Sequence, residues 1–396
     1  MKIKNSLLLF ACFTFLSCYP DNTKDIKTNT NLEKATITLD SLYKHYSVPG
    51  TCLLRENYPF DENYRATYLT AEEQANGINK YSYLWAYSGV FSAVNTMLEV
   101  TKDKSYHLLL DSCLLIGLEE YFDETRYPPA YSSYINLAPR SDRYYDDNIW
   151  IGINFIDLYR LTNDSGYLKK AKMIWEFVRS GIDEKTGEGI YWCEQKKESK
   201  NCCSNAPASV FAFKLFEVTE DTLFFHQGKQ LYEWTKKNLQ DSTDMLYFDR
   251  IMMDGKINKA KYPYNSGQMM QSAALQYKII KDPAYLKEAQ EIARSCHNYF
   301  FSEFTTNKKK KTKLFKDGNI WFYAIMLRGF AELYQLDHNK AYINTFLQVL
   351  DYAWIDSRNT KGLFNTDLSR NTQNNKKWLL TQAAMVEMYS RLENIR

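Results

Sequence analysis

Two adjacent carboxylates, Asp146 and Asp147, stand in the segment RYYDDNIW at residues 143–150, where an apolar stretch begins. Adjacent like charges repel each other, so this placement needs a reason. If both side chains overhang one pocket, the charge of one raises the pKa of the other, and the pair supplies a proton donor beside an ionised carboxylate. Retaining cleavage of glycosidic bonds uses two carboxyl groups about 5–5.5 Å apart in this way. The alternative is that the aspartates cap a helix, a position that favours Asp.

The elements that must position this pair repeat along the chain. A polar turn recurs near residues 101, 162, 219, 280, 336 and 392, with neighbouring turns about 60 residues apart, a longer period than solenoid repeats show. An apolar helical stretch precedes each turn, and an amphipathic stretch follows five of them. The last apolar stretch, residues 378–392, has no such partner after it, but residues 31–46 can supply one. We therefore predict an all-α fold, an (α/α)6 barrel of six inner and six outer helices, in one domain over residues 31–396.

The connections place the polar residues at one end of this barrel. Each connection from an outer to an inner helix takes about 20 residues, a length that is often functional. All of these connections lie where the inner helices begin, and helix N-termini favour negative charge. The segments expected there are RYYDDNIW, GIYWCEQ (189–195), CCSNAPAS (202–209), LYFDRI (246–251) and YPYNSGQ (262–268). We predict a pocket at that end.

Bulk composition narrows the class of partner. The 396 residues carry a net charge of +3, which does not support nucleic-acid binding. The 31 Tyr, 22 Phe and 8 Trp fit either a large aromatic core or a site that stacks on sugar rings.

The N-terminus is typical of a processed export signal. Lys2 and Lys4 precede the apolar run SLLLFACFTFLS, which is too short to span a bilayer as a permanent helix. The run ends in FLSC and is similar to a bacterial lipobox, so we predict a signal peptide at 1–17, acylation of Cys18, and a lipid-anchored linker at 18–30. The protein would then be an exported outer-membrane lipoprotein, touching the membrane through this anchor only. Secretion with cleavage elsewhere is the alternative.

The cysteines and histidines carry little signal. Six cysteines follow Cys18, and in an exported protein some could pair, for example Cys193 with Cys202 or Cys203. Their spacing fits no zinc pattern and the histidines are scattered singly, so we predict no metal site.

Several of these segments resemble glycoside hydrolase family 76. YYDDNIWIG, then YWCEQ followed by CSNAPA, then YPYNSG, occur in the order and spacing of that family, and the resemblance runs from about residue 80 to the C-terminus. Members act on α-1,6-mannan backbones as endo-mannanases, or remodel fungal walls as transglycosidases, and have the (α/α)6 fold. The resemblance implies that Asp146 is the nucleophile and Asp147 the acid/base. It also implies that Asp249, Tyr264 and Asn265 bind substrate and that no cofactor is needed.

The sequence departs from the family at two places. Ser266 stands where Gln is usual, and residues 317–323 replace a glycine-rich segment that often carries arginine. Both departures bear on subsite preference rather than on the reaction. Further substrate-binding candidates are Tyr145 beside the acid pair, Trp192 in a long loop, and Asn205, which could instead cap its helix.

Two functions stay open. The first is a monomeric retaining hydrolase of α-1,6-mannan or mannooligosaccharides. The second is a non-catalytic glycan-binding lipoprotein on the same scaffold, although a binder has no need of two adjacent carboxylates. An unsaturated glucuronyl hydrolase ranks lower, because the helix starts lack a basic cluster for a uronate.

Overall fold

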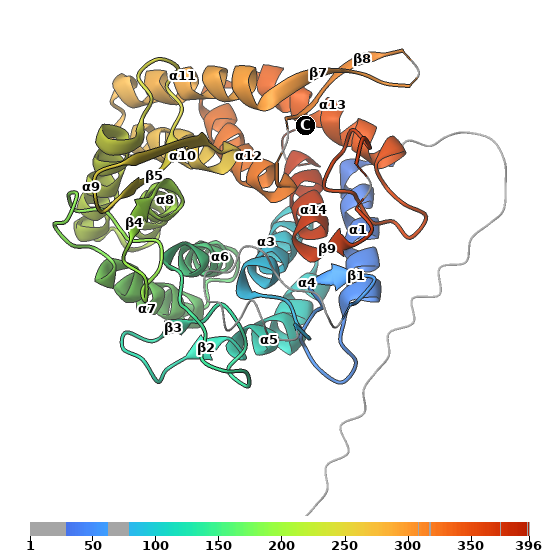
Figure 1. The fold of residues 1–396 in the computed structure, drawn as a ribbon, viewed down its shortest axis with the longest axis horizontal. Helices are drawn as coiled ribbons and strands as arrows, with labels where there is room; N and C mark the ends of the chain where they lie inside the picture. Colours follow the sequence, from blue (N-terminus) through green and yellow to red (C-terminus); the bar gives the residue numbers. More distant parts are fainter. Residues whose placement is uncertain are drawn as a thin grey trace, which may run out of the picture.

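The computed structural model describes residues 29–61, 79–307, 309–316, 318–372, 374–393 and 395. Helices in these ranges form two concentric rings, seen along the common axis in Figure 1. The inner ring consists of α3 (Leu84–Thr101), α6 (Tyr145–Thr162), α8 (Cys202–Thr219), α10 (Pro263–Ile280), α12 (Ile320–Asp337) and α14 (Leu379–Glu393). The outer ring consists of α1 (Asn31–Tyr46), the bent arm α4 (Lys104–Leu109), η1 (Leu110–Leu114) and α5 (Leu115–Glu119), then α7 (Ser165–Ser180), α9 (Thr222–Leu239), α11 (Pro283–Phe300) and α13 (Lys340–Asp356).

The two ends of the chain close the barrel. Helix α14 packs against α3 to complete the inner ring, and α1 packs on α14 as its outer partner (Figure 1). The prediction of an (α/α)6 barrel is confirmed. The proposed signal peptide and Cys18 lie outside the described residues. Of the helices in the described ranges, none combines the length and the apolar character that crossing a membrane requires.

A repeated two-residue turn links each inner helix to the next outer one. The inner helix ends on a residue in the left-handed region, and the following Asp or Asn accepts a hydrogen bond from a backbone N–H of the next helix. Left-handed backbone is unfavourable for residues with a Cβ, and the cap that follows offsets part of that cost. These turns are the polar repeat of the sequence, at Lys102–Asp103, Asn163–Asp164, Glu220–Asp221, Lys281–Asp282 and His338–Asn339.

Helices α10 and α12 approach each other closely because glycines face each other. A Cβ on Gly329 would lie 2.3 Å from the carbonyl oxygen of Gly267, and a Cβ on Gly267 would lie 2.5 Å from the Cα of Met326. Neither position has room for a larger residue, so this pair of glycines sets the spacing of the two helices.

The long connections all lie at the end where the inner helices begin, as predicted. They contain short antiparallel strands: β1 (Asn57–Tyr58) with β9 (Lys377–Trp378), β2 (Phe122–Asp123) with β3 (Ala130–Tyr131), β4 (Ser199–Asn201) with β5 (Phe248–Met252) and β6 (Ile257–Lys261), and β7 (Phe301–Thr305) with β8 (Lys311–Phe315). We call this end the mouth and the opposite end the base.

The fourth residue of each inner helix holds the loop that precedes the helix. In α6 the Asn148 side chain accepts from the N–H of Tyr131 (2.8 Å) and donates to its carbonyl (2.9 Å). Asn205 in α8 does the same to Ile190, at 2.7 and 2.9 Å. In α14 the equivalent residue is Gln382, which holds Phe364. These buried amides are satisfied by backbone groups that would otherwise lack partners.

In the other three inner helices the fourth residue is a hydroxyl. Ser266 of α10 accepts from the N–H of Tyr247 at 3.1 Å. Tyr87 of α3 donates to the carbonyls of Cys52 and Leu114, and Tyr323 of α12 donates to those of Phe300 and Lys316. Ser266 is therefore a loop clamp, and the departure noted at this position lies beneath a loop.

Candidate active site

A cleft of about 510 Å³ opens at the mouth of the barrel. The second residue of five inner helices lines it, because side chains in the first turn lean toward the helix N-terminus and so overhang the mouth. These residues are Trp85, Asp146, Cys203, Tyr264 and Trp321. Further lining comes from Asp147, Trp150, Trp192, Asp249, Arg250 and residues just before the helices.

The acid pair lies in the first turn of α6. Helix α6 starts at Tyr145, and its N-cap residue is Tyr144, whose side chain makes no capping hydrogen bond. Both carboxylates are half-buried and both line the cleft. Neither aspartate is therefore the N-cap residue of α6, and both face the cleft.

The two carboxyl groups differ in affinity for a proton. Burial raises the pKa of Asp146 to about 6, while the Cys203 thiol, the Trp192 indole N–H and backbone N–H groups act to lower it. Burial and the charge of Asp146 raise the pKa of Asp147 well above its usual value. Asp147 therefore holds a proton more tightly than Asp146 does.

The donor to Asp146 comes from the loop between α7 and α8. The Trp192 Nε1–H donates to Oδ2 of Asp146 at 3.2 Å. The other carboxylate oxygen, Oδ1, is buried and has no hydrogen-bond partner among the described residues. One oxygen of Asp146 is thus fixed and the other is uncommitted.

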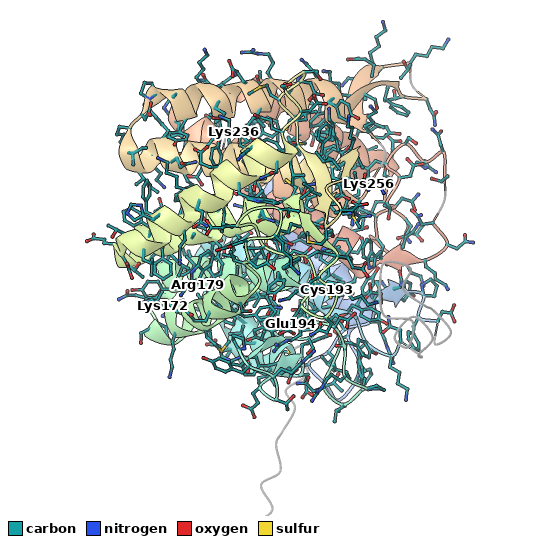
Figure 2. The ribbon with its side chains drawn as sticks, turned by 60° about the vertical axis from the view of Figure 1, so that its left-hand side comes forward. Lys172, Arg179, Cys193, Glu194, Lys236 and Lys256 are labelled. Carbon is teal, nitrogen blue, oxygen red and sulfur yellow. The ribbon has the colours of Figure 1, made fainter. Side chains whose placement is uncertain are left out.

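Backbone pairing and a buried ion pair place this loop over the acids. The N–H of Tyr145 donates to the carbonyl of Trp192 at 3.0 Å, and the N–H of Glu194 donates to the carbonyl of Arg143 at 3.0 Å. The fully buried Arg143 guanidinium also donates to the Glu194 carboxylate. Figure 2 marks Cys193 and Glu194 on this loop. The segment before α6 and the Trp192 loop are therefore held together.

Aromatic rings form one wall of the cleft. Tyr264 and Phe322 stack with centroids 4.2 Å apart and planes at 21°, and Phe322 also stacks on Trp85. Trp321 meets Trp150 edge to face at 5.2 Å. Apolar ring faces beside carboxylates suit a ligand that carries both hydroxyls and C–H surfaces, such as a sugar.

A third carboxylate enters from strand β5. Asp249 lines the cleft and is largely buried. Burial raises its pKa, and the adjacent Arg250, with Nη1 at 3.4 Å from Oδ2, acts to lower it. Asp249 is placed to accept hydrogen bonds from ligand hydroxyls.

The structure brings some predicted site residues together and separates others. Asp146, Asp147, Trp192, Asp249 and Tyr264 all line the cleft. Three other predicted ligands, Tyr145, Asn205 and Asn265, do not line it, and those assignments are corrected.

Contacts hold two of the three away from the cleft, and the third is buried. Tyr145, the first residue of α6, points outward and stacks on Phe177 of α7 at 4.7 Å. The side-chain amide of Asn205 is hydrogen-bonded to the backbone of Ile190 in the loop clamp. Asn265 is fully buried in α10, and neither amide atom has a hydrogen-bond partner among the described residues.

The position of a residue within its inner helix indicates cleft-lining residues that the sequence motifs did not. Trp85, Cys203 and Trp321 occupy the same second position as Asp146. The residue just before a helix also lines the cleft in four cases: Tyr83, Tyr144, Asn201 and Tyr262. Aligning the six helix starts with one another predicts both sets.

The cysteines of the described chain are unpaired. Cys193, Cys202 and Cys203 are free thiols and buried, so the short disulfide considered from the sequence is not formed. Within the described ranges no cluster of three or more His, Cys, Asp or Glu side chains could hold a metal ion. That the reaction needs no metal stays a prediction.

Comparison with known proteins agrees with this geometry. A sequence model of glycosyl hydrolase family 76 matches residues 60–395. The chain belongs to glycosyl hydrolase family 76. The resemblance noted in the acid-pair, Trp192 and Tyr264 segments is confirmed, and this family 76 chain is a glycoside hydrolase by family. Among curated proteins, no sequence matches it.

Solved structures of family 76 share the fold. A family 76 glycoside hydrolase from a bovine Bacteroides thetaiotaomicron strain is 29% identical, with a TM-score of 0.82, over 92% of this chain and 77% of that one. A family 76 mannosidase from Bacteroides thetaiotaomicron VPI-5482 is 31% identical, with a TM-score of 0.81, over 91% and 97% of the two chains. An inactive α-1,6-mannanase variant from Salegentibacter sp., in complex with α-1,6-mannotriose, is 23% identical, with a TM-score of 0.74, over 92% and 100%.

Proposed function

We propose that this family 76 hydrolase cleaves α-1,6-mannosidic linkages inside a mannan chain, with retention of configuration. The observation that carries the proposal is the acid pair in the cleft, with the pKa of Asp147 raised further than that of Asp146. The mannosidase and the mannanase among the structural neighbours support the substrate class. The inactive mannanase variant has two consecutive aspartates replaced by asparagine, which supports a catalytic role for the pair.

The reaction would proceed by double displacement. Asp147 donates its proton to the glycosidic oxygen as the bond to the anomeric carbon breaks, and Asp146 attacks that carbon to form a glycosyl-enzyme. Asp147, now ionised, takes a proton from water, whose oxygen attacks the anomeric carbon and releases Asp146. The Trp192 indole, which donates to Oδ2 of Asp146, would orient this carboxylate for the attack.

The substrate test compares linkages. The purified protein is incubated with linear α-1,6-mannan, with branched yeast mannan and with an α-1,2-linked mannooligosaccharide. We expect α-1,6-linked oligosaccharides of several lengths from the linear polymer and none from the α-1,2 control. Proton NMR of the first product should show the α-anomer. A β-anomer would refute retention, and products of one sugar only would refute endo action.

The alternative of a non-catalytic glycan binder keeps one supporting feature, the aromatic wall beside Asp249. A binder would show saturable affinity for α-1,6-mannotetraose and release no reducing ends on prolonged incubation. The same incubation therefore decides between the two functions.

We also propose that the protein is an outer-membrane lipoprotein anchored at Cys18. The lipobox-like end of the apolar N-terminal run supports this. Replacing Cys18 by alanine should move the protein from the membrane fraction to the soluble exported fraction. Unchanged membrane association in that variant would refute the anchor.

A further inference from the structure

A second cavity, of about 420 Å³, lies at the base of the barrel. It is built from the C-terminal halves of the inner helices, so it opens at the end opposite the catalytic cleft. A water molecule occupies about 30 Å³ of liquid, and cavities of this size accommodate small organic ligands. The volume is therefore comparable with that of the cleft, while the lining is different.

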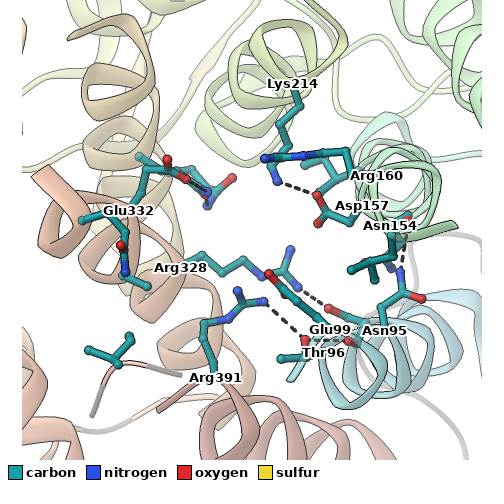
Figure 3. Close-up of a pocket in the computed structure, with 18 of the residues that line it drawn as sticks. Asn95, Thr96, Glu99, Asn154, Asp157, Arg160, Lys214, Arg328, Glu332 and Arg391 are labelled. Carbon is teal, nitrogen blue, oxygen red and sulfur yellow. Dashed lines mark hydrogen bonds and ion pairs between the residues drawn. The ribbon is translucent and has the colours of Figure 1, made fainter. Parts of the chain in front are cut away.

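Basic side chains dominate this lining. Six lysines and arginines line the cavity, against three acids, Glu99, Asp157 and Glu332. Figure 3 shows Arg160, Arg328 and Arg391 directed toward the same space from α6, α12 and α14. Arg328 is only 7% exposed, so its charge is held in place rather than free in solvent.

The cations share their acidic partners. Arg328 and Arg391 both pair with Glu387, at 2.7 and 3.0 Å. Arg160 and Lys278 both approach Glu217, at 3.6 and 2.8 Å. Lys278 also approaches Glu332, at 3.6 Å, so Arg160 and Lys278 face two carboxylates. Arg328 and Arg391 form ion pairs with one carboxylate only, so positive charge remains in that group. The pair Lys214 and Asp157 is one to one at 2.6 Å.

Some guanidinium donors in the cavity also lack a hydrogen-bond partner among the described residues. Among the described residues Arg160 makes no hydrogen bond and only the 3.6 Å ion pair. Arg328 uses Nε and Nη2 on Glu387 and Ser92, which leaves Nη1 without a partner in the described chain. The carbonyl ends of the inner helices explain why cations gather at the base. They do not explain unused guanidinium donors, which suit the oxygens of a carboxylate or a phosphate.

We propose that the base cavity binds a small organic oxyanion, a carboxylate or phosphate ester of about monosaccharide size. Arg160 and Arg328 supply the donors, and Arg391 adds charge. The site is physically joined to the cleft: the Arg328 guanidinium carbon lies 5.7 Å from the centre of the Trp150 ring, and Trp150 lines the cleft. Binding of the oxyanion does not depend on which glycan the cleft takes.

Titration calorimetry of the purified protein tests this with gluconate and with glucose 6-phosphate, and with glucose as the uncharged control. We expect saturable binding of at least one anion and none of glucose. Arg160→Gln should weaken that affinity about tenfold, as expected for one charge-assisted hydrogen bond. If only glucose 6-phosphate binds, the ligand class is a phosphate ester; if only gluconate binds, it is a carboxylate.

Two control variants locate the anion. Arg179→Gln removes an arginine of equal exposure on outer helix α7 (Figure 2), whose side chain is 42% exposed against 44% for Arg160 and pairs with Glu176 at 3.3 Å. Arg250→Gln removes the arginine that lines the cleft. Neither should change the affinity. No saturable binding up to about 10 mM would overturn the proposal, as would affinity lost in Arg250→Gln but kept in Arg160→Gln.

Discussion

The pKa values of acids shift in opposite directions at the mouth and at the base of the barrel, and helix α6 carries an example of each. At the start of α6, burial raises the pKa of Asp146 and Asp147. Three turns later, Asp157 is also half-buried, but Lys214 holds its pKa below the usual value. At the base, Arg328 and Arg391 likewise lower the pKa of Glu387 to about 2, against the effect of burial.

The difference lies in the neighbours. Desolvation acts in the same direction at both ends, and the presence or absence of a cation decides the result. At the base the acids hold helices together as ion pairs. At the mouth, Asp146 and Asp147 have no such partner among the described residues, and their protons remain available for chemistry. A shifted pKa of an acid therefore indicates a functional site only when the direction of the shift and its physical cause are both considered.

The largest expected effect is the loss of turnover when either acid at the mouth is replaced. Asp146→Asn and Asp147→Asn should each lower turnover of α-1,6-mannan by about 10⁴-fold, the order seen when a reacting residue is removed. Neither change should lower the melting temperature. At Asp146 a neutral amide costs less to bury than a carboxylate, and at Asp147 the amide replaces a carboxyl group whose pKa favours the neutral form. Reducing-sugar assays and thermal unfolding measure the two quantities. Turnover within tenfold of the unchanged protein would refute the assignment.

At the base, the matching change should affect stability instead. Glu387→Gln leaves Arg328 and Arg391 without their common carboxylate, and breaking a buried ion pair costs about 3–5 kcal/mol. Urea unfolding should show this loss, with turnover at low temperature largely kept. A loss below about 1 kcal/mol would mean that the base charges are solvated and not structural.

The pH dependence of kcat/KM should report the two carboxyl groups at the mouth. Since Asp146 must be ionised and has a pKa of about 6, kcat/KM should fall about tenfold per pH unit below that value. Deprotonation of Asp147 should give a second, alkaline limb. A profile that is flat from pH 4 to 7 would contradict the proposed roles.

Stability should respond to pH in opposite directions. The pKa of Asp146 in the folded protein is above its ordinary 3.8. The contribution of Asp146 to the free energy of unfolding is therefore lost as pH rises from about 4 through 6. The folded pKa of Glu387 is below its ordinary 4.5, so its contribution is present above that value and lost as pH falls toward 2. Urea unfolding of Asp146→Asn and Glu387→Gln against the unchanged protein, at several pH values, measures both.

The smallest effect sharpens the picture of the mouth. Trp192→Phe removes the donor to Asp146 while keeping an aromatic ring, so the acid limb should move to higher pH and kcat/KM at pH 6 should fall about tenfold. Trp234→Phe is the control, because its indole donates to the carbonyl of Thr186 at 2.9 Å, outside the cleft lining. Simple loss of stacking would raise KM and leave the acid limb in place.

Periodicity was sufficient to predict the fold. Apolar stretches ending in a repeated polar turn require paired helices, and the partnerless last stretch requires the N-terminal helix to close the ring. The position of the acid pair at a helix start placed it at the mouth. The helix pattern also carries the second-position rule, which predicts Trp85, Cys203 and Trp321 as lining residues.

Only the tertiary structure decided which polar side chains reach the cleft. Tyr145 and Asp146 are neighbours in sequence, but successive helical residues diverge by roughly 100°, so one packs on Phe177 and the other faces the cavity. Asn205 and Ser266 hold loops whose course no local pattern contains. The base network joins residues from different inner helices, because a charge finds its partner through packing between segments far apart in the chain.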